Sequence, residues 1–214
     1  MLDNIIVNTQ SSIRISGSSV VYFDPFGIPA EPHDADYIFI THDHYDHFSP
    51  EDILKVLNRD SIMIVPISMQ CKVIDFKKTV KDIITVIPGI THQQGSYVSF
   101  NTVPSYNKAK PFHPKKQGWC GYILNLDGIR YYIAGDTDNL SENYSIECDV
   151  ALIPIGGTYT MNVSQAAEFV NAIKPMYAVP THYGTIVGSN EDGLHFSCSV
   201  NPTTKVVLKL GENP

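Results

Sequence analysis

The chain has 214 residues, of which 43% are hydrophobic, and a formal net charge of −7. This length and composition predict a single domain over residues 1–214 with one organised core. The acidic balance disfavours nucleic-acid binding, and the absence of a signal-like start and of a membrane-length apolar run predicts a cytoplasmic protein without a membrane span.

Short runs of β-branched and aromatic residues fill the first part of the chain. They predict a meander of antiparallel strands at residues 4–9, 12–16, 19–23 and 37–40. Ser49-Pro50-Glu51-Asp52 then reads as an N-cap, a proline at the first helical position and an acidic first turn, which predicts a helix through Leu57. A strand at 61–65, a short helix at 67–74 and a strand at 83–87 are expected to follow.

The second half of the chain repeats this order. Strands are predicted at 97–103, 121–126 and 129–134, with Asp127-Gly128 as the two-residue hairpin turn between the last two. A buried strand at 149–153, an amphipathic helix at 164–173 capped by Ser164, and strands at 176–179 and 204–210 complete the chain. Strands followed by helices, twice over, predict two packed sheets with helices on the outer faces.

The most informative segment is the hexapeptide that follows the apolar run 36–41. It reads His42-Asp43-His44-Tyr45-Asp46-His47 and offers imidazole nitrogens and carboxylate oxygens, the ligands that suit zinc and also serve iron and manganese. Alternation places His42 and His44 on one side, whereas Asp46 and His47 follow a bend and can turn toward a second ion. The hexapeptide therefore predicts two adjacent metal sites at the edge of a sheet.

Two weaker candidates lie at strand ends in the second half. Asp136 follows Gly135 where a predicted strand stops, and His182 ends the segment Tyr177-Ala-Val-Pro-Thr-His182 before a glycine turn. Taken alone, Asp136 is as well explained by a turn aspartate, and His182 is better explained by a hydrogen-bonded structural histidine. Their recurrence at strand ends places them with the hexapeptide on one rim of the sandwich.

Together these motifs resemble the metallo-β-lactamase superfamily, whose His-x-His-x-Asp-His signature matches residues 42–47. Gly135-Asp136 and His182 match the later metal ligands of that family, and the resemblance covers essentially the whole chain. The runs Pro154-Ile-Gly-Gly157-Thr158-Tyr159 and His182-Tyr183-Gly184-Thr185 are similar to the compact branch that resembles ascorbate-6-phosphate lactonases and N-acyl-phosphatidylethanolamine phospholipases D. The resemblance implies an α+β fold, an αββα sandwich of two mixed β-sheets with helices on the outer faces.

The resemblance also implies a ligand set for two divalent ions, for which zinc is preferred over manganese or iron. One first-site position stays open between His113 and Asn107. Its place relative to Pro104-Ser105 favours Asn107, but an amide is a poorer zinc ligand than imidazole, and His113 is preferred as the histidine nearer to the strand that enters Gly121. His92 is expected in a loop, and His33 and His195 have no assigned role. The implied ligands are His42, His44 and His113 for the first ion, Asp46, His47 and His182 for the second, and Asp136 as the bridge.

The implied activity is that of a metal-dependent hydrolase in which a metal-bridging hydroxide attacks a small ester, lactone or phosphodiester. Asp46 is the candidate catalytic residue, as acceptor of the proton in the reaction. The alternatives are an iron-dependent oxidoreductase on the same fold and a non-catalytic metal-binding or sensing module. The expected partner is a small-molecule substrate, and a homo-oligomer is compatible with the sequence.

Several neighbours are candidates for tuning this site. Asp43 is equally well explained as an acceptor that orients an imidazole and as a solvated acid. For Tyr159 and Tyr183 a packing role is favoured over contact with substrate. Lysines flank His113 and are candidates for contacting an anionic substrate, with a solvated loop as the equal alternative. They are Lys108, Lys110, Lys115 and Lys116.

Overall fold

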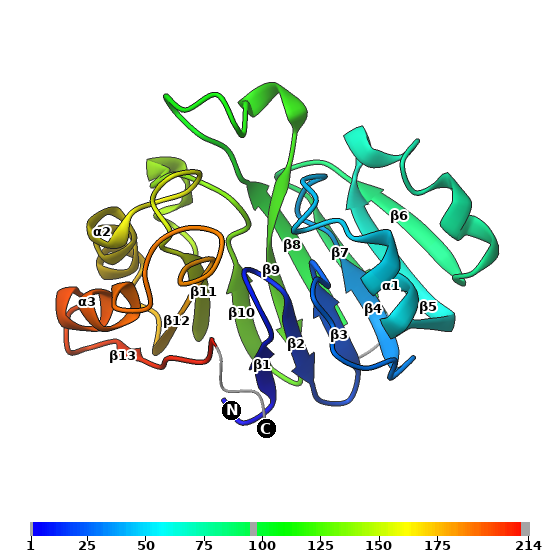
Figure 1. The fold of residues 1–214 in the computed structure, drawn as a ribbon, viewed down its shortest axis with the longest axis horizontal. Helices are drawn as coiled ribbons and strands as arrows, with labels where there is room; N and C mark the ends of the chain where they lie inside the picture. The colour runs from blue at the N-terminus through cyan, green and yellow to red at the C-terminus, as the bar shows by residue number, and fades with distance from the viewer. Residues whose placement is uncertain (1, 95–97, 211–214) are drawn as a thin grey trace.

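The computed structural model describes residues 2–94 and 98–210 and contains two mixed β-sheets with helices on their outer sides. In Figure 1 the sheets occupy the middle of the molecule. Helix α1 (Pro50–Val56) lies on one side, and α2 (Val163–Ile173) and α3 (Asp192–Ser199) lie on the other. The predicted αββα sandwich of the α+β class is confirmed.

The first sheet has six strands in chain order, and only its first three form an antiparallel meander. β4 pairs with β3 in parallel, so the prediction that the strand at 37–40 continues the antiparallel meander was wrong. β5 with β4, and β6 with β5, also pair in parallel. A connection over residues 24–34 returns the chain to the start of the sheet, which a parallel pair requires. The strands are β1 (Ile5–Val7), β2 (Ile13–Ser16), β3 (Val20–Phe23), β4 (Ala35–Phe39), β5 (Leu57–Pro66) and β6 (Asp82–Val86).

The second sheet has seven strands in the order β13-β12-β11-β10-β9-β8-β7. The predicted hairpin is confirmed, because Asp127 and Gly128 both adopt the positive φ angles, 54° and 79°, of a tight turn between β9 and β10. Strand β7 was missed because Thr91-His92-Gln93-Gln94 has no apolar alternation. The strands are β7 (Thr91–Gln94), β8 (Val98–Pro104), β9 (Cys120–Leu126), β10 (Ile129–Ile133), β11 (Val150–Pro154), β12 (Tyr177–Thr181) and β13 (Lys205–Val206).

The ends of several elements differ from the prediction. Residue 97, the predicted start of one strand, lies outside the described residues, and the strand predicted at 204–210 is only two residues long. Leu210 instead makes an isolated bridge with Val7 of the other sheet. The predicted helix at 67–74 is two short 3₁₀ turns, Ile67–Met69 and Ile74–Lys78. Helix α3 was not predicted.

The helix starts show how local chemistry sets the boundaries. Ser49 caps α1 as predicted, since its side chain accepts a hydrogen bond from the backbone N–H of Asp52. The cap of α2 is Asn162 and not Ser164, because Asn162 and Gln165 form a reciprocal capping box with each other's backbone. The helix therefore begins one residue earlier than the sequence suggested.

Three apolar layers hold the sandwich together. The central layer fills the space between the sheets, and an aromatic cluster at its centre includes Phe39, Phe100 and Tyr122. The outer layers lie under α1 and under α2 and α3. Tyr122 also donates a 2.8 Å hydrogen bond to the carbonyl of Ile40, which ties the end of β4 to the opposite sheet. Among the described residues, no helix is long and apolar enough to cross a membrane.

Candidate metal centre

The predicted ligand residues meet where loops leave the strands of both sheets. The hexapeptide follows β4, Asp136 follows β10 and His182 follows β12. His113 comes from the segment between β8 and β9, which projects beyond the sheets in Figure 1. These ligand residues are buried, except for His44, which is partly exposed. The strand ends thus bring together residues that are far apart in the sequence, from His42 to His182.

Three imidazoles form a first group with their ring nitrogens facing one another. His42 Nε2 lies 3.1 Å from His44 Nδ1 and 3.3 Å from His113 Nε2. All three ligand atoms lie within 4.8 Å of each other. Three nitrogens at these separations can each direct a lone pair at one point, which is how imidazoles surround a single cation.

A second group contains Asp46, His47 and His182, again within 4.8 Å of one another. Asp46 Oδ2 lies 3.3 Å from His182 Nε2 and 3.7 Å from His47 Nε2. This group contains the residues that follow the bend of the hexapeptide, together with the histidine from β12. Its mixed oxygen and nitrogen donors suit a second divalent ion.

The carboxylate of Asp136 lies between the two groups. Its Oδ2 atom is 3.3 Å from His113 Nε2 and 3.3 Å from His182 Nε2, and its Oδ1 atom is 3.3 Å from His47 Nε2. Asp136 therefore contacts members of both groups.

Buried polar atoms in this cluster lack hydrogen bonds, which tests whether the residues fit a metal. His47 Nε2, Asp136 Oδ1 and both ring nitrogens of His182 make no hydrogen bond to any described residue. Buried polar atoms are normally satisfied, because leaving one unpaired costs about 1–3 kcal/mol. Convergent, unpaired N and O donors therefore fit a bound divalent cation.

The pKa values of the cluster follow from burial and from neighbouring charges. Burial lowers the pKa of His42 well below its usual range and also lowers that of His44, so both rings stay neutral and keep a lone pair for a metal. Burial opposes the charge on Asp136, but His182 and His47 outweigh it and hold its pKa well below the usual range. The pKa of His47 is raised because Asp136 and Asp24 outweigh the effect of burial.

Asp24 orients His47 and was missed at the sequence level. It follows β3, is fully buried, and accepts hydrogen bonds from Thr41 N at 2.7 Å and Thr41 Oγ1 at 2.6 Å. Its Oδ2 atom also lies 2.7 Å from His47 Nδ1, which leaves His47 Nε2 for the cluster. The available signal was a carboxylate directly after the buried strand Val20–Phe23.

The alternatives His113 and Asn107 occupy different roles in the structure. His113 lies in the first group, whereas Asn107 Oδ1 accepts a hydrogen bond from the backbone N–H of His113 at 3.1 Å and lies 2.9 Å from its Nδ1. The amide of Asn107 thus contacts the far side of the imidazole. Asn107 Nδ2 donates in turn to Asp138 and to the carbonyl of Tyr159.

Trp119 is a second residue that sequence reasoning missed. Its ring centroid lies 5.0 Å from that of His42, 5.2 Å from His44 and 5.6 Å from His113. The side chain is only 5% exposed, so it forms a dry wall beside the first group. Such a wall limits solvent access and strengthens electrostatic interactions within the group.

The side chains of most other sequence candidates pair or pack with residues that are not ligands. Asp43 forms an ion pair with Lys72 at the surface, and Tyr183 packs in the apolar layer under α3. His92 is in β7 and not in a loop, stacked on Phe100, while His33 contacts the carbonyl of Leu57 and His195 is on α3.

The lysines proposed to contact substrate have other neighbours. Lys110 Nζ lies 3.1 Å from Asp138 Oδ1 and donates to the carbonyls of Gly157 and Thr160. Lys115 lies 3.2 Å from Glu142 Oε1 and over the ring of Tyr106. Lys108 and Lys116 do not line the pocket described next.

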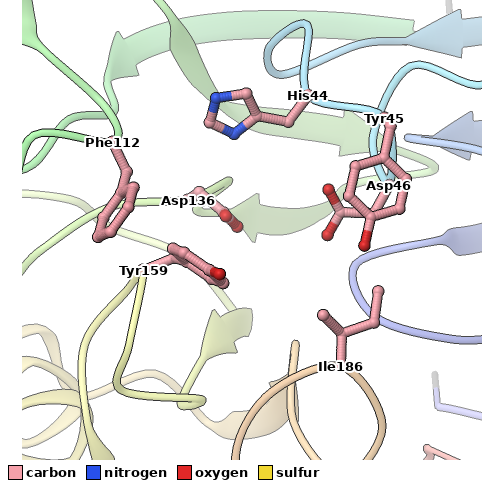
Figure 2. A pocket seen from close by; sticks show the side chains of 7 residues that line it. All are labelled: His44, Tyr45, Asp46, Phe112, Asp136, Tyr159 and Ile186. Carbon is pink, nitrogen blue, oxygen red and sulfur yellow. The ribbon is translucent and has the colours of Figure 1, made fainter.

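A pocket of about 310 Å³ opens directly onto the cluster. Figure 2 shows the carboxylates of Asp46 and Asp136 pointing toward its middle, with aromatic and aliphatic side chains around them. A concave, largely apolar pocket that converges on a few polar groups is the usual form of a small-molecule site. The lining residues are His44, Tyr45, Asp46, Phe112, Asp136, Tyr159 and Ile186.

Comparison with known protein families gives one family model over most of the chain. The model, described as a beta-lactamase superfamily domain, matches residues 8–182. The matched segment begins before β2 and ends at His182, so it includes every residue of the two groups and Asp136.

Individual relatives match over nearly their full lengths. A UPF0173 metal-dependent hydrolase of Pyrococcus furiosus is 34% identical over 219 aligned residues, which cover 95% of each chain. A crystal structure of a Parabacteroides distasonis protein assigned as a metal-dependent hydrolase is 29% identical, with a TM-score of 0.80 and coverage of 96% of this chain and 92% of the other. Igni18, a metallo hydrolase of Ignicoccus hospitalis, has the same fold, with 22% identity, a TM-score of 0.78 and coverage of 95% and 93%.

Proposed function

We propose a function from the family of this chain, which belongs to the β-lactamase superfamily and, within it, to the UPF0173 metal-dependent hydrolases. The proposed activity is hydrolysis of a small ester, lactone or phosphodiester at a centre of two divalent ions. The observation that most strongly supports two ions in one centre is the position of Asp136 beside both ligand groups. Its carboxylate lies 3.3 Å from His113 in one group and 3.3 Å from both His47 and His182 in the other.

The residues would divide between the ions as their positions suggest. His42, His44 and His113 would hold the first, Asp46, His47 and His182 the second, and Asp136 both. We favour zinc because imidazole-rich mixed donor sets suit it, although manganese and iron accept the same ligands. When bound, two such ions supply Lewis acidity and lower the pKa of water toward neutral.

Side chains that line the pocket would supply the proton transfer that the reaction requires. Asp46 faces the pocket, and His182 and His47 lower its pKa below the usual range against the effect of burial, so it is ionised at neutral pH. An ionised carboxylate at this position can accept the proton of the attacking water. His44 and Asp136 line the same pocket, so a substrate in the pocket would lie beside both the metal ligands and Asp46.

The test is to count metal ions per chain by elemental analysis of protein purified without added metal or chelator, and to repeat the count with His42→Ala. About two zinc or manganese ions in the wild type, fewer in the variant, and metal-dependent hydrolysis of an ester, lactone or phosphodiester would support the proposal. Fully loaded protein that hydrolyses none of these substrates would refute it. Bound iron with redox activity would favour the oxidoreductase alternative.

A further inference from the structure

The pocket over the cluster has two apolar sides. On one side Phe112 and Tyr159 lie edge to face, with ring centroids 4.7 Å apart and an interplanar angle of 86°. On the other side stand Tyr45 and Ile186, and Figure 2 shows the two carboxylates between these walls. The four side chains come from four separate loops, so the apolar lining is not the exposed face of one helix or strand.

Three of these four side chains are exposed in spite of their apolar character. Tyr45 is 65% exposed, Phe112 40% and Ile186 44%. Clustered apolar side chains that remain open to solvent beside convergent polar groups are typical of a ligand site. An occupant would cover them and gain the hydrophobic stabilisation that the free protein lacks.

The lining carries no cationic side chain among the described residues. Lys110, the lysine nearest in sequence to Phe112, is bound to Asp138 and to two backbone carbonyls, and Lys115 is paired with Glu142. The walls therefore offer no partner for an ionised group held away from the metal cluster. A carboxylate or phosphate placed there would lose hydration without an ion pair.

The volume of the pocket matches a small occupant. About 310 Å³ is at the lower end of the range of roughly 300–1,000 Å³ found for small-molecule sites. The pocket can accept one ring or short branched chain packed against its apolar side chains, with the reacting group beside Asp46 and Asp136. A long acyl chain or a polymer would extend beyond the walls.

We propose that the substrate is a small uncharged ester or lactone whose aromatic or branched aliphatic group packs against Phe112 and Tyr159, and that these residues with Ile186 select it. This inference rests on the proposed hydrolase function. It replaces the anionic substrate that the sequence suggested, because the lysines behind that suggestion do not line the pocket.

The test compares three 4-nitrophenyl esters with metal-loaded protein. Their acyl groups are phenylacetyl, which adds a ring, acetyl, which lacks it, and succinyl, which adds a carboxylate. We expect kcat/KM for phenylacetyl to exceed that for acetyl by about tenfold or more, the factor that burial of an aromatic group supplies. We expect the succinyl ester to be the poorest of the three.

Variants of the apolar side chains test whether they cause the preference for the phenylacetyl ester. Phe112→Ala should reduce the phenylacetyl-to-acetyl ratio by about tenfold, and Ile186→Ala should reduce it to a lesser degree. Ile67→Ala is the matched control, because Ile67 is 48% exposed, like Ile186 at 44%, but lies outside the pocket. It should leave the ratio unchanged.

A binding measurement on metal-free protein separates this inference from the function on which it rests. Ligand-observed NMR should detect 3-phenylpropionamide and not propionamide, and Phe112→Ala should remove the signal. If loaded protein hydrolyses none of the esters but the ring binds, the proposed ester hydrolysis fails and the apolar recognition stands. Ester hydrolysis without a preference for phenylacetyl, a preference for succinyl, or ring binding unaffected by Phe112→Ala would overturn the inference.

Discussion

One oxygen of Asn107 holds His113 at two points, the backbone N–H at 3.1 Å and the ring Nδ1 at 2.9 Å. The amide orientation is fixed because Asn107 Nδ2 donates to two acceptors, Asp138 Oδ1 at 3.0 Å and the carbonyl of Tyr159 at 2.9 Å. The oxygen can only accept, so His113 Nδ1 carries the proton. The lone pair of His113 is then on Nε2, which faces His42 and Asp136.

Asn107→Ala is expected to weaken metal binding without removing a ligand. Loss of an orienting partner typically lowers metal affinity 10–100-fold, and we expect a decrease of about that size for the ion that His113 would hold. Competition with a chromophoric chelator measures it. His113→Ala should cause a larger decrease, and equal affinity of Asn107→Ala and wild type would show that the hydrogen bond does not position the ring.

Asp24→Asn is expected to destabilise the metal-free protein by about 1–3 kcal/mol, the cost of disrupting a buried hydrogen-bonded group. Asp24 accepts from Thr41 twice and lies 2.7 Å from His47, and both Asp24 and His47 are fully buried. Urea unfolding measures the change. Asp43→Asn is the control, because Asp43 pairs with Lys72 at the surface, and it should change stability by less than about 1 kcal/mol.

Gly135→Ala should be more damaging than Gly118→Ala, although the two glycines have nearly the same φ, 63° and 64°. A Cβ at Gly135 would lie 3.0 Å from Thr41 Cβ and 3.1 Å from Ser105 Oγ, whereas a Cβ at Gly118 meets nothing within 4 Å. Backbone strain alone costs roughly 1–2 kcal/mol. We expect Gly118→Ala to lower the free energy of unfolding by this amount. Gly135→Ala should lower it further and should also weaken metal binding, because the clash displaces Asp136. Equal unfolding free energies for the two variants would contradict this account.

Metal removal should lower the melting temperature. A ligand present at about 1,000 times its Kd stabilises the native state by about 4 kcal/mol. For a chain of this size each kcal/mol corresponds to roughly 2–4 °C, so chelation should lower Tm by about 8 °C or more. Calorimetry with and without chelator measures the shift. A Tm insensitive to chelator and to added zinc would count against a tightly bound centre.

Trp119 provides an optical signal for the first group. It is the single tryptophan of the chain, and its ring lies about 5 Å from those of His42 and His44. Metal titration should therefore change its fluorescence, and the change should be lost in His44→Ala. A change of the same size in His44→Ala would show that the signal arises from elsewhere.

The sequence by itself determined the features that depend on neighbours in the chain. The cap of α1 at Ser49, the hairpin at Asp127-Gly128 and the buried strand before the hexapeptide follow from local backbone preferences and from alternation. The spacing within residues 42–47 likewise predicted two ligand groups, because alternation followed by one bend in the chain directs these side chains to two places. The sequence did not predict β7 or α3, whose residues carry weak local patterns.

Tertiary structure decided whatever depends on residues distant in the sequence. The parallel pairing of β3 with β4 is set by packing of the sheet, and the roles of Asn107 and His113 are set by which of them faces the cluster. The contacts of Asp24 and Trp119, and the pairing of Lys110 away from the pocket, arise only when segments far apart in the chain meet. Chemical type along a sequence indicates what a side chain can bind, but three-dimensional packing fixes which partner it reaches.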